Sequence, residues 1–195
     1  MKRKNQKINV IGIDEAGRGP LAGPVAIGAV ASKIKNKKSK IKILEGIKDS
    51  KKLSAKKREE WNKILRENFE CHCVFVSHKI IDKMGIQKAV LLGVERVLKK
   101  FRKPNLVLLD GLLKAPEKYK QKTIIKGDEK ISLISAASII AKTIRDRKMI
   151  QLHKKFPKYN FDKHKGYGTK LHYRRIRKHG ILKIHRKSFL KNLTK

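Results

Sequence analysis

The chain has 195 residues, and 39% of them are hydrophobic, which is enough for one folded domain with a core of ordinary size. Lys and Arg number 52 against 16 Asp and Glu, and the net charge of +36 predicts a polyanionic partner such as nucleic acid, although nucleotide bias is an alternative source of the lysine excess. No apolar stretch is long enough to span a bilayer, and the basic start lacks the apolar run of a signal peptide, so we expect a cytoplasmic protein.

Strand patterns occupy, in chain order, residues 8–13, 25–31, 71–77, 106–109 and 123–125. Helical patterns occupy residues 55–68, 86–101, 130–155 and 170–179. The connection Pro20–Pro24 is short enough for a hairpin between the first two strands. Two hairpin-linked strands and a third therefore precede alternating strands and helices. This order predicts an α/β fold with a mixed sheet that carries helices on its faces.

Two cysteines, Cys71 and Cys73, flank His72 on the third predicted strand. Cysteines one residue apart do not form an ordinary structural disulfide. A zinc site is one interpretation of Cys-His-Cys, but the chain has no second cysteine pair. We therefore expect the two cysteines to lie on one side of the strand as small buried hydrophobic residues.

Four of the sixteen acids follow predicted strands, namely Asp14, Glu15, Asp110 and Asp128. Strand ends are where α/β sheets place their sites, and carboxylates that converge there repel one another unless divalent cations neutralise them. Hard oxygen ligands select Mg²⁺ or Mn²⁺, and two such ions about 3.5–4 Å apart catalyse phosphoryl displacement. The pattern predicts a nuclease. The alternative is that these acids are turn and cap residues, since Asp110-Gly111 is also a good turn pair.

Asp14 and Glu15 are adjacent, and adjacent residues of a regular strand point to opposite faces of the sheet. We expect Gly17 and Gly19 to break the pleat here so that both acids face one metal. Two alternatives remain open at this point. One acid binds through its backbone carbonyl, or it serves a second metal ion.

Seven stretches, taken together, resemble the ribonuclease HII family, the type 2 ribonucleases H. They are residues 12–25, 49–53, 108–111, 126–128, 135–147, 164–169 and 185–189. The resemblance implies a ribonuclease H-like fold, in which a five-stranded mixed sheet is flanked by helices and followed by a C-terminal helical segment. We expect residues 1–156 to form the catalytic core and residues 157–195 to pack on it within a single structural domain.

The same resemblance implies endonucleolytic cleavage of RNA in RNA–DNA hybrids and incision on the 5′ side of a ribonucleotide embedded in duplex DNA. The products would carry a 3′-hydroxyl and a 5′-phosphate. Asp14, Glu15, Asp110 and Asp128 match the family's catalytic, metal-binding acids, which hold one or two Mn²⁺ or Mg²⁺ ions.

The loop Gly17-Arg18-Gly19 matches the family's loop that senses the ribose 2′-hydroxyl through backbone contacts. Glycines allow such a close approach, and the 2′-hydroxyl is the group that distinguishes RNA from DNA. Tyr167 matches the tyrosine that stacks on the sugar at the RNA-to-DNA junction. The alternative for Tyr167 is a loop anchor with a solvated hydroxyl.

Further basic residues are candidate phosphate ligands: Lys51, Lys52, Lys142 and Arg145. Each of them is equally well explained as an ordinary solvated charge. Asp146 lies one helical turn beyond Lys142 and is expected to pair with it rather than with a metal. Five late histidines, at positions 153, 164, 172, 179 and 185, are expected to form a basic nucleic-acid face rather than a zinc site, because no ligand spacing recurs.

Three other interpretations are alternatives to this one. The related ribonucleases HIII carry an additional N-terminal substrate-binding domain, whereas only about seven residues precede the first predicted strand here. A non-catalytic RNA- or ribosome-binding protein and another nuclease or recombinase on the same fold are the other two. We expect a monomer. Contact with a sliding clamp stays open, since residues 192–195 form no clear docking motif.

Overall fold

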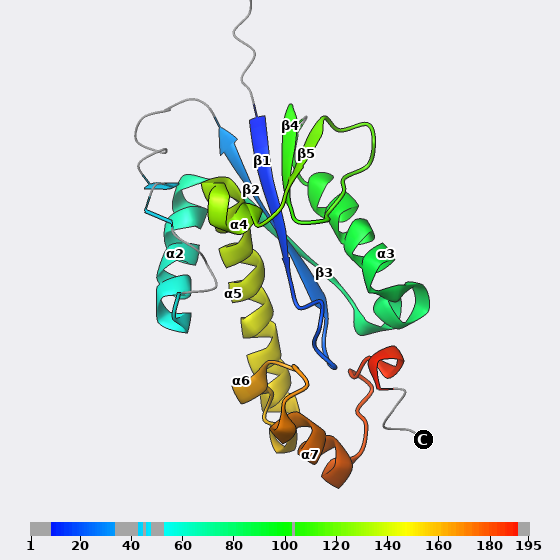
Figure 1. The fold of residues 1–195 in the computed structure, drawn as a ribbon. Coiled ribbons are helices and arrows are strands. Elements are labelled where there is room, and N and C mark those ends of the chain that lie inside the picture. Colours follow the sequence, from blue (N-terminus) through cyan, green and yellow to red (C-terminus); the bar gives the residue numbers. More distant parts are fainter. Residues whose placement is uncertain (1–8, 34–42, 45, 48–52, 103, 191–195) are drawn as a thin grey trace, which may run out of the picture.

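The computed structural model describes residues 9–33, 43–44, 46–47, 53–102 and 104–190 (Figure 1). One five-stranded sheet has the order β3-β2-β1-β4-β5. Its strands are β1 (Asn9–Ala16), β2 (Val25–Lys33), β3 (Glu70–Val76), β4 (Leu106–Asp110) and β5 (Gln121–Ile124). β2 is antiparallel to β1 and β3, whereas β4 is parallel to β1 and β5. The predicted hairpin, element order and mixed sheet are confirmed.

Helices cover both faces of the sheet (Figure 1). On one face, α3 (His78–Leu98) packs its apolar side on residues of β1, β2 and β4 that include Ile11, Ile27 and Leu109. On the other face, α2 (Ala55–Asn68) and α5 (Ser132–Lys155) pack on Val30 and on the cysteines of β3. Alternation along each strand thus sends successive side chains into two different cores.

The helix α5 lies directly on the backbone of β1 and β2. A Cβ atom placed on Gly12 of β1 would lie 2.4 Å from the carbonyl oxygen of Leu133, and one on Gly28 of β2 would lie 2.4 Å from that of Ala137. Residues 136–138 of α5 are small and buried, as their sequence predicts. The two glycines therefore determine how closely α5 approaches the sheet.

Two helices differ from their predicted bounds for local reasons. The prediction for α3 began at residue 86, and the structure adds the turns from His78, separated from the rest by a kink at Gly85 (φ 80°, ψ 159°). Ser77 caps this added part by accepting a hydrogen bond from the amide of Ile80. The prediction of one helix over 130–155 is replaced by α4 (Gly127–Lys130) and α5, which are separated by Ile131.

The strand β5 also departs from prediction. It begins two residues earlier than the apolar run 123–125 and ends at Ile124. It lies at the edge of the sheet, so its side chains are half-buried or exposed, and Ile125 is 72% exposed. Asp128 consequently lies in α4, and the prediction that it directly follows a buried strand is wrong.

The C-terminal segment contains η2 (Pro157–Tyr159), α6 (Phe161–His164), α7 (Lys170–His179) and η3 (Lys187–Phe189). The predicted helix over 170–179 is confirmed by α7. Tyr159 and Phe161 form a small core with Met149 of α5 and Ala22 of the β1–β2 connection. Within the described residues, no helix combines the length and apolarity that crossing a membrane requires.

Replacing Gly28 with Ala should lower the free energy of unfolding by about 1–3 kcal/mol, because the added methyl group forces α5 away from β2. Thermal or urea unfolding measures the loss. Gly19→Ala is the matched control, since nothing lies within 4 Å of a Cβ atom at that position. Equal stability of G28A and the parent chain would contradict the close contact.

Candidate active site

A cleft of about 400 Å³ opens at the end of β1. Its residues come from β1, the loop after it, α2, β4, α5 and the loop that precedes α7. They are Asp14, Glu15, Ala16, Gly17, Arg58, Asp110, Ser138, Lys142 and Tyr167. Three of the four predicted acids thus meet in one place, although they are far apart in the sequence.

The two acids of β1 lie in a regular strand. Pairing with β2 continues through Ala16, so the predicted break in the pleat at the acids is wrong, and the chain departs from the strand only at Gly17 (φ 94°). Asp14 faces α5, where Ser138 donates a hydrogen bond to it. Alternation places Glu15 on the opposite face. Both residues nevertheless line the same cleft, which lies at the end of the strand.

Burial and neighbouring carboxylates disfavour the charged forms of Asp14 and Glu15. Burial, the Glu15 carboxylate and the Asp110 carboxylate raise the pKa of Asp14 well above its usual value, against an opposing hydrogen bond from Ser138. Burial also raises the pKa of Glu15, although Arg18 opposes this from a distance of 3.4 Å between Nη1 and Oε1. The carboxylates are therefore held in a place that a nearby positive charge would stabilise.

Asp110, the last residue of β4, is connected to α4 by hydrogen bonds. Its Oδ1 accepts from the amide of Gly127 at 2.6 Å and from the amide of Asp128 at 3.3 Å. The Asp128 side chain is 1% exposed and is not among the residues that line the cleft. The hydroxyl of Ser135 donates to the carbonyl of Asp128. The structure thus places the fourth acid beside Asp110, behind the wall of the cleft.

The donor set at the cleft consists of carboxylate oxygens, which suits Mg²⁺ or Mn²⁺. Oε2 of Glu15 is buried and has no hydrogen-bond partner in the described structure. A buried carboxylate oxygen without a partner is a suitable ligand for a cation. In the positions seen here, no three acidic, histidine or cysteine side chains of the described residues lie close enough together to hold a metal ion. The acids fit a hard cation by chemistry, and they would have to close around it.

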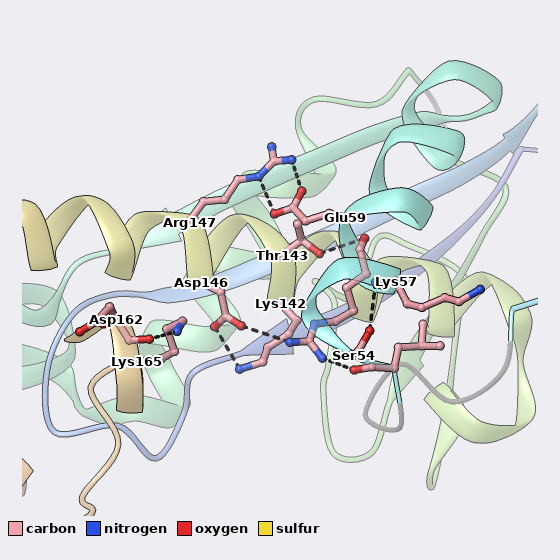
Figure 2. Close-up of polar contacts among 11 residues, drawn as sticks. Ser54, Lys57, Glu59, Lys142, Thr143, Asp146, Arg147, Asp162 and Lys165 are labelled. Atoms are coloured by element: carbon pink, nitrogen blue, oxygen red, sulfur yellow. Dashed lines mark hydrogen bonds and ion pairs between the residues drawn. The ribbon is translucent and has the colours of Figure 1, made fainter. Parts of the chain in front are cut away.

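Two basic residues, Arg58 and Lys142, line the cleft. Figure 2 shows Lys142 beside Asp146. Asp146 accepts from Nζ of Lys142 at 3.0 Å, which confirms the predicted pair, and its other oxygen lies 3.6 Å from Nη2 of Arg58. This shared carboxylate holds two cations from α2 and α5 at the cleft. Arg58 was not predicted. The sequence showed only that Arg58 is a basic residue in the first turn of a helix capped by Ser54. It did not show that this turn faces the cleft.

Arg145 does not occupy the position expected of a phosphate ligand. Its side chain has no exposed surface, because it lies beneath the loop that follows β1. Nε donates to the carbonyl of Pro24 and Nη2 donates to that of Lys165, both at 3.1 Å. Two other candidates, Lys51 and Lys52, lie outside the described residues.

A second buried arginine, Arg186, holds the loop after β1 from behind. It donates to the carbonyls of Gly17 at 2.7 Å, Arg18 at 2.6 Å and Gly23 at 3.0 Å. Burial, and then the neighbouring Arg145 charge, lower its pKa to about 9. Gly19 does not line the cleft. Sequence reasoning did not single out Arg186, although it lies in one of the stretches that carry the family resemblance.

Tyr167 is 39% exposed and lines the cleft, with its backbone between Gly166 and Gly168. The ring centroid lies 5.6 Å from Nζ of Lys142 and 5.5 Å from Cζ of Arg145. Its amide donates to the carbonyl of His164 at 2.9 Å. An exposed ring on a fixed backbone, with cations on it, is suited to stacking on a sugar or base.

Three of the late histidines are buried and do not form the predicted basic face: His164, His172 and His185. The His164 and His172 rings stack with centroids 4.2 Å apart, and Nε2 of His172 lies 3.1 Å from Nε2 of His185. Nδ1 of His172 lies 3.0 Å from the carbonyl oxygen of Tyr167, so the cluster helps to fix the tyrosine. His153 instead pairs with Asp162 at 3.2 Å.

Cys71 and Cys73 are partly buried and pack against the core beneath α5. Burial raises the pKa of each thiol to about 12. The expectation of small hydrophobic residues is confirmed, and neither thiol is suited to metal binding in this state.

Comparison with known proteins identifies close relatives. The ribonuclease HII family model matches residues 11–192. The ribonuclease HII of Caldicellulosiruptor bescii is 44% identical over 186 residues, which cover 94% of this chain and 87% of that protein. The ribonuclease HII of Fusobacterium nucleatum is 47% identical over 192 residues, which cover 95% of this chain and 87% of that protein. A chain in the structure of the PCNA:RNase HII complex from Archaeoglobus fulgidus is 28% identical, with a TM-score of 0.78 and coverage of 95% of this chain and 97% of that one.

The buried histidines should remain neutral far into the acid range. Burial lowers the pKa of His172 and of His185 from 6.5 to about 4, so the unfolded chain takes up protons first as the pH falls. The stability that they contribute is present above about pH 6.5 and is lost as the pH falls towards 4. NMR titration of the imidazole protons tests this directly. Titration of both rings above pH 6 would contradict the buried cluster.

Proposed function

Because the chain belongs to the ribonuclease HII family and has the ribonuclease H-like fold, it is a ribonuclease H, and we propose that it cuts by metal-dependent phosphodiester hydrolysis. We further propose that it acts on RNA in RNA–DNA hybrids and nicks duplex DNA on the 5′ side of an embedded ribonucleotide. The products then carry a 3′-hydroxyl and a 5′-phosphate. The convergence of Asp14, Glu15 and Asp110 in one cleft with a basic wall carries this proposal.

Asp14, Glu15 and Asp110 would hold one or two Mg²⁺ or Mn²⁺ ions, and Asp128 would join them through its position beside Asp110. When bound, such ions activate water and stabilise the charge that develops on the attacking and leaving oxygens. The crowded carboxylates support this assignment, because Glu15 and Asp110 raise the pKa of Asp14, Asp110 raises the pKa of Glu15, and a cation relieves that repulsion.

Other residues of the cleft bind and orient the nucleic acid in this proposal. Arg58 and Lys142 meet the phosphates next to the scissile one, and Asp146 pairs with both of their side chains. Tyr167 stacks on the sugar at the junction. The Gly17–Gly19 loop approaches the ribose closely enough to sense its 2′-hydroxyl.

The other partners stay predictions. The Archaeoglobus relative is found in a complex with PCNA, and this supports proposing a sliding-clamp contact for this chain. Residues 192–195 lie outside the described residues. A monomer, a cytoplasmic location and the division at residue 156 likewise stay predictions.

A duplex DNA with one embedded ribonucleotide should be nicked on its 5′ side when Mn²⁺ or Mg²⁺ is present, and should stay intact when EDTA removes the metal. Gel electrophoresis with an end label shows both the cut and its position. A matched duplex without the ribonucleotide serves as the control. A protein that binds the substrate but never cuts it with any divalent metal would overturn the proposed function.

Asp128→Asn should lower the cutting rate at least about 100-fold while leaving duplex binding intact, because the change removes one metal-binding charge and reduces repulsion of phosphate. The neighbouring Glu129 is exposed, so Glu129→Gln is a matched control that should cut normally. Single-turnover rates and anisotropy measure the two properties separately. Full activity of D128N would remove Asp128 from the metal-binding set.

A further inference from the structure

Two arginines with no exposed surface, Arg145 and Arg186, lie next to the loop that follows β1. Burying a guanidinium is costly, and here the hydrogen bonds of both go to backbone carbonyls. The Arg145 charge also lowers the pKa of Arg186, which means that the two cations are near each other. Two neighbouring buried guanidinium groups are unfavourable by themselves, so their role is to be found in the backbone segments whose carbonyls they bind.

Arg186 determines the direction of two consecutive peptide groups. Its Nη2 and Nη1 bind the carbonyl oxygens of Gly17 and Arg18. In a planar trans peptide the N–H points opposite to the C=O, so the amides of Arg18 and Gly19 point away from Arg186. No hydrogen bond in the described structure uses either amide. By fixing these two peptide groups, the Arg186 guanidinium leaves the amides of Arg18 and Gly19 as unpaired donors on the side of the loop that faces away from it.

Arg145 connects the same loop to Tyr167. A Cβ atom on Gly17 would lie 1.9 Å from Nε of Arg145, so the guanidinium rests directly on the glycine. The centroid of the Tyr167 ring lies 5.5 Å from Cζ of the same guanidinium. Nη2 also binds the carbonyl of Lys165, two residues before the tyrosine. One buried side chain therefore sets the spacing between the loop and the ring.

We propose that Arg186 and Arg145 are positioning residues for ribose recognition, with Arg186 aiming the amides of Arg18 and Gly19 at the sugar hydroxyl and Arg145 holding Tyr167 beside them. The inference rests on the proposed function. In this proposal the two arginines do not touch the substrate, but they contribute to the selection of ribose over deoxyribose by positioning the groups that do. Lysine cannot replace either of them, because one ammonium group cannot reproduce the planar fork of donors.

The test compares Arg186→Lys and Arg145→Lys with the parent chain, and uses Arg147→Lys as the matched control. Arg147 is an exposed arginine of α5 that pairs with Glu59. Fluorescence anisotropy in EDTA gives Kd for a duplex with one ribonucleotide and for the same duplex in all-DNA form. If part of a variant is unfolded, both apparent Kd values change by the same factor. Their ratio then stays the same, so only a change in ribose recognition alters it.

The parent chain and R147K should prefer the ribonucleotide duplex, and each of R186K and R145K should lose about tenfold of that preference while the Kd for all-DNA duplex stays the same. Circular dichroism checks folding, and either folded variant is enough for the test. A parent chain that nicks but binds both duplexes equally, or folded variants that keep the preference, would overturn the inference alone. A parent chain that fails to nick with Mn²⁺ would overturn the proposed function instead.

Discussion

The close packing of α5 on β1 and β2 is the constraint on which the candidate site depends. At Gly12 and Gly28 no side chain separates the helix from the strands, so α5 lies at backbone distance from the sheet at these two positions. Successive turns of the helix then bring Ser138 to Asp14, Lys142 to the cleft and Arg145 to the loop after β1. This spacing of three or four residues keeps all three on one helix face.

Charge in the interior follows from that packing. Burial and neighbouring carboxylates raise the pKa values of Asp14 and Glu15 at the cleft, while the two buried arginines at the adjacent loop are held by carbonyl oxygens. The acids line the cleft, whereas the two guanidinium groups bind backbone carbonyls. The fold therefore maintains separated charges of opposite sign at one end of the sheet, an arrangement suited to a cation and a polyanion that bind together.

The sheet, the hairpin and the three acids of the cleft were predictable because they depend on local patterns, in which apolar runs are followed by carboxylates. Asp128 was misplaced because an apolar run suggests a buried strand, whereas β5 is an edge strand and the chain turns into α4 after Ile125. Arg145 and Arg186 could not be distinguished from the other cations among 52, since burial depends on partners distant in sequence. The burial of His164, His172 and His185 could not be predicted for the same reason.

The hydrogen bond between Gly17 and Arg186 joins residues 169 positions apart. During synthesis the loop after β1 leaves the ribosome long before the segment that holds it, and the Ala22–His185 bridge forms equally late. The sheet strands and α5 are by then already available to fold. The hydrogen bonds that order the loop therefore form only after Arg186 has been translated, which is later than the synthesis of the acids and the sheet strands.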